Sequence, residues 1–210
     1  MDMIGGSGME GFIFFWLFWI FWICSTFFMS KKELRLKISI GILVAISLSM
    51  NSITIFQVEI SLTNLFLLIL SYFIMAKLKG KTRNYLFITS FIIMLAYTTF
   101  HLYELFDPVW VIFNRYMMLS LLLAYLTILL QSDLHLRVIT LLCGAIHGDI
   151  LYSLILRKFS LTYSSGSFAF LDVIAISITL LLMISGFKRV SVYFEHHIKQ
   201  QLEREKQKQS

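Results

Sequence analysis

The chain has 210 residues, of which 58% are hydrophobic and only 14% are charged. A soluble domain of this size needs more polar surface than that, so the composition excludes a water-soluble globular protein. The net charge of +6 would suggest a nucleic-acid partner in a soluble protein, but here the cations lie in short breaks between apolar stretches and in the C-terminal tail. We therefore interpret them as flanks of membrane helices and expect no nucleic-acid partner.

Seven apolar stretches follow one another, each close to the roughly 20 residues that a helix needs to cross a bilayer. They predict an all-α integral membrane protein, with a bundle of seven transmembrane helices in residues 1–187. The predicted spans are about 12–29, 38–56, 60–76, 85–103, 109–130, 138–156 and 168–187. The second and third are divided only by Gln57, Val58 and Glu59, where we expect a helical hairpin.

The first span has no Lys or Arg before it and is followed directly by Lys31 and Lys32. This pattern predicts an uncleaved helix with the N-terminus outside and, after seven crossings, the C-terminus in the cytoplasm. Fifteen of the 18 Lys and Arg residues then fall on the inner side. The other three, Arg115, Arg157 and Lys158, fall on or near the outer side, and the last two test the count. The segment Met1–Gly8 differs from the rest, and we hypothesise that Met9 is the physiological start; the alternative is an ordinary N-terminal segment.

Ionisable residues within the spans gather in the outer half of the membrane, where they are costly unless they face protein or water. The members of this candidate intramembrane polar cluster are His101, Glu104, Arg115, His147, Asp149 and Asp172. Arg115 follows Pro108 and is expected about two turns inside the fifth span. One interpretation is an outward-facing polar cavity organised by an Arg115–Asp149 contact; the other is that the charges neutralise one another and fix helix packing.

The sixth span combines small and ionisable residues within the segment Cys143–Asp149. Gly144 and Gly148 form a small-xxx-small pair that predicts the close approach of another helix. His147 and Asp149 are two residues apart, about 200° around a helix, so each is expected to find its partner on a different element.

The tail, residues 188–210, is predicted to be a basic amphipathic helix in the cytoplasm. An apolar residue recurs at every fourth position, at Val190, Phe194, Ile198 and Leu202. We interpret this stripe as a surface that lies against lipid headgroups. The alternative is a docking helix for a membrane-protein partner or for a second copy in a homo-oligomer.

The opening MEGFIFFWLFWIFW from Met9, the seven-span pattern and the segment GAIHGDILY from Gly144 to Tyr152 carry a resemblance over nearly the whole chain. They resemble the small YphA-like membrane proteins of spore-forming Gram-positive bacteria. The resemblance implies a multi-pass protein of the bacterial cytoplasmic membrane. It implies no activity that can be transferred to these residues.

Three classes of function are open on the sequence alone. The preferred one is a non-enzymatic scaffold, sensor or accessory subunit, with no cofactor, no metal and no catalytic residue. The alternative is a transporter or channel for a small solute or ion, although no inverted repeat or matched pair of Gly/Pro-broken helices is visible. An intramembrane enzyme that uses His101 or His147 ranks last, since no nucleophile motif is present.

Overall fold

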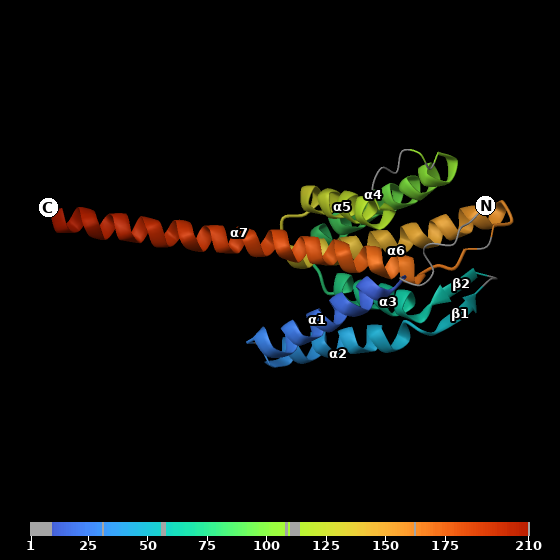
Figure 1. Cartoon of the computed structure of the whole chain (residues 1–210), viewed down its shortest axis with the longest axis horizontal. Helices are drawn as coiled ribbons and strands as arrows, with labels where there is room; N and C mark the ends of the chain where they lie inside the picture. The colour runs from blue at the N-terminus through green and yellow to red at the C-terminus, as the bar shows by residue number, and fades with distance from the viewer. Residues whose placement is uncertain are drawn as a thin grey trace.

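The computed structural model describes residues 10–30, 32–55, 58–107, 109, 114–161 and 163–209. Within them, seven helices and one small two-stranded sheet follow in the order α1(Phe12–Phe28), α2(Lys32–Leu48), β1(Ser52–Ile55), β2(Val58–Ser61), α3(Leu62–Ala76), α4(Gly80–Phe106), α5(Arg115–Leu130), α6(Leu134–Lys158) and α7(Phe168–Gln209). Figure 1 shows the helices aligned along one axis, with α7 projecting far beyond the others at one end. The hypothesis that Met9 is the start of the chain falls outside the described residues.

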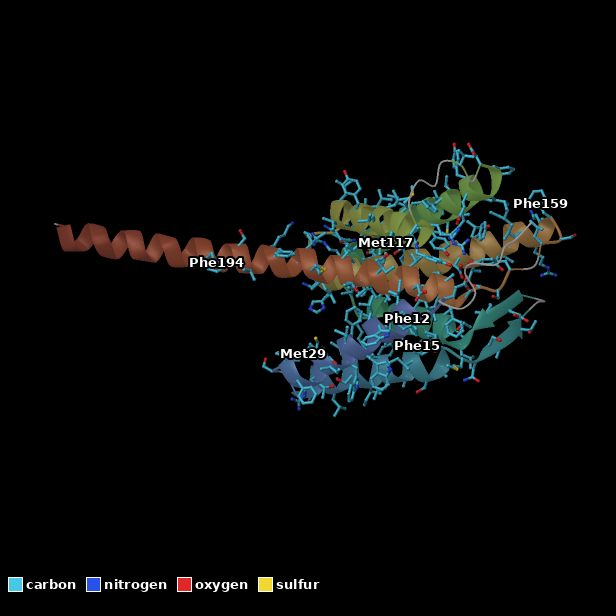
Figure 2. The ribbon with its side chains drawn as sticks, in the orientation of Figure 1. Phe12, Phe15, Met29, Met117, Phe159 and Phe194 are labelled. Carbon is cyan, nitrogen blue, oxygen red and sulfur yellow. The ribbon has the colours of Figure 1, made fainter. Side chains whose placement is uncertain are left out.

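Helices α1, α4, α5, α6 and α7 supply most of the apolar core, and α6 is buried along most of its length. Apolar side chains also cover the outside of the bundle, as a protein surrounded by lipid requires. Figure 2 shows Phe12 and Met117 on this outer surface, where they are 56% and 49% exposed. Phe15 instead packs against Phe168 of α7, with ring centroids 6.0 Å apart.

In the part of the chain that the structure describes, three helices are long and apolar enough to cross a bilayer, namely α4, α6 and α7 from Phe168 to Lys188. Helices α1, α3 and α5 are apolar but shorter. In α2 the first turns carry Glu33, Arg35 and Lys37, which lower the apolarity of that segment.

The connection between α2 and α3 differs from the prediction of a helical hairpin. Helix α2 ends at Leu48, and β1 and β2 then pair antiparallel, with Ser52 opposite Ser61 and Ile55 opposite Val58. The predicted helical path to residue 56 is therefore wrong. The physical reason is the density of β-branched residues in Ile53–Ile55 and Val58–Ile60, which suit a strand better than a helix.

The small sheet is extended by the connection between α6 and α7. Ser61 N–H donates to the carbonyl of Ser165, and Ser165 N–H donates to the carbonyl of Glu59, at 2.9 and 2.8 Å. Ile60 and Ser165 thus form a parallel bridge beside β2. This pairing holds the 159–167 connection between α6 and α7 beside β2.

Helix α5 begins later than the sequence suggested. Asn114 is its N-cap, and the Asn114 side chain accepts a hydrogen bond from Tyr116 N–H at 3.0 Å. Arg115 is consequently the first residue of the helix rather than a residue two turns inside it, because the capping side chain fixes the start. Pro108, which we expected in the first turn, lies outside the described residues.

Candidate functional site

The most highly connected polar side chain among the described residues is Asp149 of α6, which is completely buried. Its Oδ1 accepts from the hydroxyls of Tyr163 and Tyr97 at 2.7 and 3.0 Å. Its Oδ2 accepts from Gly166 N–H at 2.6 Å and from the Ser165 hydroxyl at 2.7 Å. A carboxylate only accepts hydrogen bonds, so this set of donors offsets the cost of burying its charge.

The donors to Asp149 come from separate parts of the fold. Tyr97 lies on α4, whereas Tyr163, Ser165 and Gly166 lie on the connection from α6 to α7. Asn64 at the start of α3 adds a longer contact from Nδ2 to Oδ2 at 3.5 Å. Asp149 therefore fastens the 159–167 connection to α3, α4 and α6 at once.

Two residues of this connection are specialised for the site. Gly166 has a φ of 74°, and a Cβ added there would lie 2.7 Å from the Asn64 Cβ, so only glycine brings its N–H to the carboxylate without strain. Burial and the neighbouring Asp149 carboxylate raise the pKa of the Tyr163 phenol, which keeps this hydroxyl protonated and donating.

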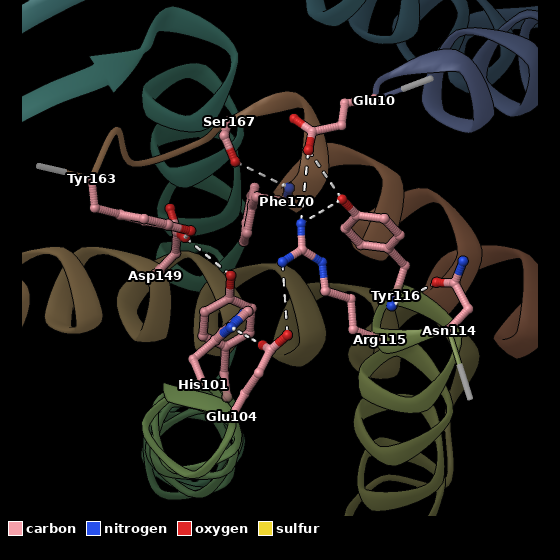
Figure 3. A network of polar contacts seen from close by, with 11 residues as sticks. Glu10, His101, Glu104, Asn114, Arg115, Tyr116, Asp149, Tyr163, Ser167 and Phe170 are labelled. Carbon is pink, nitrogen blue, oxygen red and sulfur yellow. Dashed lines mark hydrogen bonds and ion pairs between the residues drawn. The ribbon is translucent and has the colours of Figure 1, made fainter. Parts of the chain in front are cut away.

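A second polar group lies at the C-terminal end of α4 and the start of α5 (Figure 3). His101 Nδ1 and Glu104 Oε2 are 3.2 Å apart, and Arg115 Nη1 lies 3.7 Å from Glu104 Oε1. Arg115 Nη2 also lies 3.8 Å from Glu10 Oε1. The His101 ring stacks on Tyr152 with a centroid distance of 5.0 Å.

The predicted Arg115–Asp149 contact is wrong. Arg115 pairs with Glu104 and Glu10, while Asp149 takes its hydrogen bonds from neutral donors. The two side chains also differ in burial: the Arg115 side chain is 50% exposed, whereas Asp149 is completely buried and its oxygens are already occupied by protein donors.

Asp172 forms a third, separate group in the first turn and a half of α7. Its Oδ2 accepts from Gly11 N–H at 2.8 Å and its Oδ1 from Phe14 N–H at 2.7 Å. These are free amides at the N-terminus of α1, which a carboxylate from another element can cap. Asp172 thus ties the first helix to the last.

His147 points away from Asp149, as their helical spacing predicts, and meets α3 instead. Its Nε2 lies 2.6 Å from Tyr72 Oη, and its Nδ1 lies 2.6 Å from the carbonyl oxygen of Cys143. The six candidate residues therefore occupy four places: the Asp149 site, the Arg115–Glu104–His101 group, the Asp172 cap and the contact of His147 with Tyr72.

Gly144 and Gly148 lie where α4 and α6 approach most closely. A Cβ on Gly144 would lie 2.5 Å from the Ile93 Cβ, and one on Gly148 would lie 2.8 Å from the Tyr97 Cβ. The Thr98 hydroxyl also donates to the Gly148 carbonyl at 3.1 Å. The close contact of α4 with these glycines brings Tyr97 within reach of Asp149.

Sequence reasoning missed most of the partners of Asp149. Tyr163, Ser165 and Gly166 belong to the short run Tyr163–Ser167, whose hydroxyls and glycine were an available signal of local hydrogen bonding. Among the described residues, no group of three or more His, Cys, Asp or Glu side chains is placed to hold a metal ion.

A bundle of apolar helices whose outer surface is also apolar defines an integral membrane protein. The chain belongs to the family of YphA-like integral membrane proteins, whose family model matches residues 10–208. It is similar to the uncharacterized protein YphA of Bacillus subtilis (strain 168), with 26% identity over 184 residues that cover 87% of this chain and 91% of the relative. No solved structure matches the chain. These findings confirm the family resemblance seen in the sequence.

Proposed function

We propose that this protein is a non-enzymatic scaffold, sensor or accessory subunit of the bacterial cytoplasmic membrane, and that α7 carries its contact with a partner in the cytoplasm. The observation behind this proposal is the length of α7, a single helix of 42 residues from Phe168 to Gln209. Its apolar part ends near Lys188. The remainder extends about 30 Å further at a rise of roughly 1.5 Å per residue.

The projecting part of α7 has a physical reason to bind something. An isolated helix of this length is marginal in water unless its apolar face is packed. The sequence places Val190, Phe194, Ile198 and Leu202 on one face, and in the described part Val190 and Phe194 are 53% and 60% exposed. A partner helix or a second copy of the chain would cover this face.

The proposed topology has seven crossings, with the N-terminus outside and the C-terminus inside. It is supported by the arrangement in Figure 1, where the sheet and the C-terminal ends of α4 and α6 lie at one end of the bundle and α7 projects from the other. The Lys and Arg bias in the sequence favours the projecting end as the cytoplasmic one. Reporter fusions test this directly. Alkaline phosphatase inserted after Ser160 should be active and green fluorescent protein at the C-terminus should fluoresce; the reverse pattern would overturn the topology.

The partner role is tested by photo-crosslinking in living cells. A photoreactive amino acid is placed at Phe194, at Ile198 or, as a control on the opposite face, at Gln200. We expect discrete protein adducts from Phe194 and Ile198 and none from Gln200, with twice the mass of the chain if the partner is a second copy. Adducts to lipid alone from all three positions would show that the tail lies on headgroups and would refute the proposal.

Transport of a small solute or ion is the second candidate, and the outer group of His101, Glu104 and Arg115 is the observation that favours it. The arrangement around Asp149 favours it less. A transport carboxylate has to exchange its partners, whereas Asp149 is completely buried and accepts four hydrogen bonds of 2.6–3.0 Å from the protein itself. Solute flux in proteoliposomes that falls with Glu104→Gln at unchanged folded yield would reverse this preference.

A further inference from the structure

A small pocket opens on the outer surface of the bundle where α3, α4 and α6 meet, on the side of α6 opposite Asp149. Its volume is about 100 Å³, and its lining includes Tyr72, Ser90, Phe91, Cys143 and His147. Phe91 is 55% exposed and Tyr72 36% exposed, so the pocket opens outward, which in a membrane means toward lipid. Ser90 and Phe91 lie in the middle part of α4 and Cys143 and His147 in the middle part of α6, whereas Tyr72 lies about one turn from the end of α3.

The hydrogen bonds of His147 fix the proton on Tyr72. The carbonyl oxygen of Cys143 only accepts hydrogen bonds, so His147 Nδ1, 2.6 Å away, carries a hydrogen and donates it. In a neutral imidazole Nε2 is then an acceptor, and Tyr72 Oη, 2.6 Å from it, is the donor. The Tyr72 hydroxyl therefore donates its hydrogen to His147. Toward the pocket, the Tyr72 oxygen can only accept a hydrogen bond.

Ser90 supplies the complementary group. Its side chain is 5% exposed, and its Oγ is buried with no hydrogen-bond partner. The Cys143 thiol beside it is only a weak partner and does not replace one. A buried hydroxyl without a partner costs free energy, about 1–3 kcal/mol by mutational estimates, so a ligand group that pairs with it is favoured.

We propose that this pocket binds the hydroxyl group of a neutral lipid alcohol. One hydroxyl satisfies both walls, because it donates to Tyr72 Oη and accepts from Ser90 Oγ. The lining contains no Lys, Arg, Asp or Glu, so the site fits an uncharged group and not a phosphate. Phe91 and its apolar neighbours fit the hydrocarbon next to that hydroxyl. Diacylglycerols and polyprenols share this chemistry.

The proposal concerns the membrane-embedded face and does not depend on a cytoplasmic role for α7. It is tested with the full-length protein in phosphatidylcholine nanodiscs and two probes, a diacylglycerol and a polyprenol, each with a photoreactive diazirine near its hydroxyl. Adduct sites are mapped by mass spectrometry. Variants are Ser90→Ala, which removes only a weak contact with the Cys143 thiol and should fold normally, and Tyr72→Phe. Tyr125→Phe is the control, since Tyr125 is 66% exposed on α5.

We expect at least one probe to label the pocket lining around Phe91 several-fold more than the exposed Leu121 and Leu129 of α5, and the labelled probe identifies the class of alcohol. Unlabelled alcohol should compete, whereas its acetate ester, which lacks the donated hydrogen, should not. Labelling should fall at least threefold in Ser90→Ala and in Tyr72→Phe and stay unchanged in Tyr125→Phe. Even labelling of all lipid-facing residues, equal competition by the ester, or undiminished labelling of Ser90→Ala would each overturn the proposal, the last because it would show that Ser90 Oγ does not pair with the hydroxyl of the probe.

Discussion

Replacement of Asp149 should separate the hydrogen-bonding role of this carboxylate from its charge. In Asp149→Ala, Gly166 N–H, the Tyr163 and Ser165 hydroxyls and the Tyr97 hydroxyl all lose their acceptor. The hydroxyls can turn toward other acceptors, but the backbone N–H cannot. With about 1–3 kcal/mol for the amide and smaller losses for the hydroxyls, we expect a total of about 3–5 kcal/mol.

Asp149→Asn should cost far less. The side-chain oxygen can face Gly166 N–H and Ser165, and the amide NH₂ can face Tyr97 and Tyr163, whose hydroxyl oxygens accept as well as donate. We expect a loss of about 1–2 kcal/mol, because each tyrosine then has to find another acceptor for its own hydrogen. Both variants lose the negative charge of Asp149. The difference between their losses of stability therefore reports on hydrogen bonding and not on charge.

The assay is thermal unfolding of the purified full-length protein in one detergent. At about 2–4 °C per kcal/mol for a chain of this size, Asp149→Ala should lower Tm by on the order of 10 °C and Asp149→Asn by a few degrees. Asp133→Ala is the matched control, because Asp133 is exposed at the start of the same helix and makes no side-chain capping bond. Equal losses in the Ala and Asn variants would refute the reasoning and would point to an ionic partner for Asp149.

Three other predictions follow from separate contacts. Gly148→Leu should abolish the folded, monodisperse species in size-exclusion chromatography, whereas Gly41→Leu, with nothing within 4 Å of the added Cβ, should be tolerated; similar behaviour of the two would contradict the α4–α6 contact. Asp172→Ala should speed hydrogen exchange at the start of α1 through a local loss of about 1 kcal/mol, and unchanged exchange would exclude the capping role. Since the pKa of Tyr163 is raised by folding, its contribution is complete below about pH 10 and falls at higher pH, as the unfolded chain loses the proton first. The free energy of unfolding, measured with a chemical denaturant, should therefore fall less in Tyr163→Phe than in the wild type between about pH 10 and 11. If the two proteins showed the same pH dependence, the raised pKa of Tyr163 would be refuted.

The parts of the fold that the sequence predicted are those set by local periodicity and by the bilayer. Helices α4, α6 and α7 contain the predicted spans, because long apolar runs have few other stable conformations in lipid. The approach of α4 to Gly144 and Gly148 was predictable for a similar reason, since small residues four apart leave one helix face open to another backbone.

The β1–β2 sheet was not predictable from apolarity alone. A short run such as Ser52–Ser61 fits the end of a membrane helix and a strand equally well on hydrophobicity. What decides in favour of strands is the β-branched content of the run together with pairing to Ser165, a residue more than a hundred positions away. The pairing with Ser165 cannot be read from any local pattern in the sequence.

The error over Arg115 shows how charge misleads inside a membrane protein. We expected Arg115 to be the partner of the buried Asp149 carboxylate because opposite charges offset the cost of burial. The structure instead supplies neutral donors from Tyr97, Tyr163 and Gly166, which carry no charge and so gave no signal in a search for opposite signs. Neutral donors avoid the desolvation of a second ion, which makes them the less costly partners at this depth.

The same reasoning explains where the acidic side chains within the bundle lie. Asp149 holds the 159–167 connection, Asp172 holds the first turn of α1, and Glu104 pairs with the start of α5. Each acidic side chain therefore meets backbone amides or cations where a helix begins or where a connection enters the bundle, and such places offer free N–H groups that a continuous helix does not. The positions of these acidic residues thus follow from how helix ends and connections are held in the bundle. A transport pathway would need at least one of these carboxylates to release its donors, and the Asp149 variants measure how firmly the most buried of them is held.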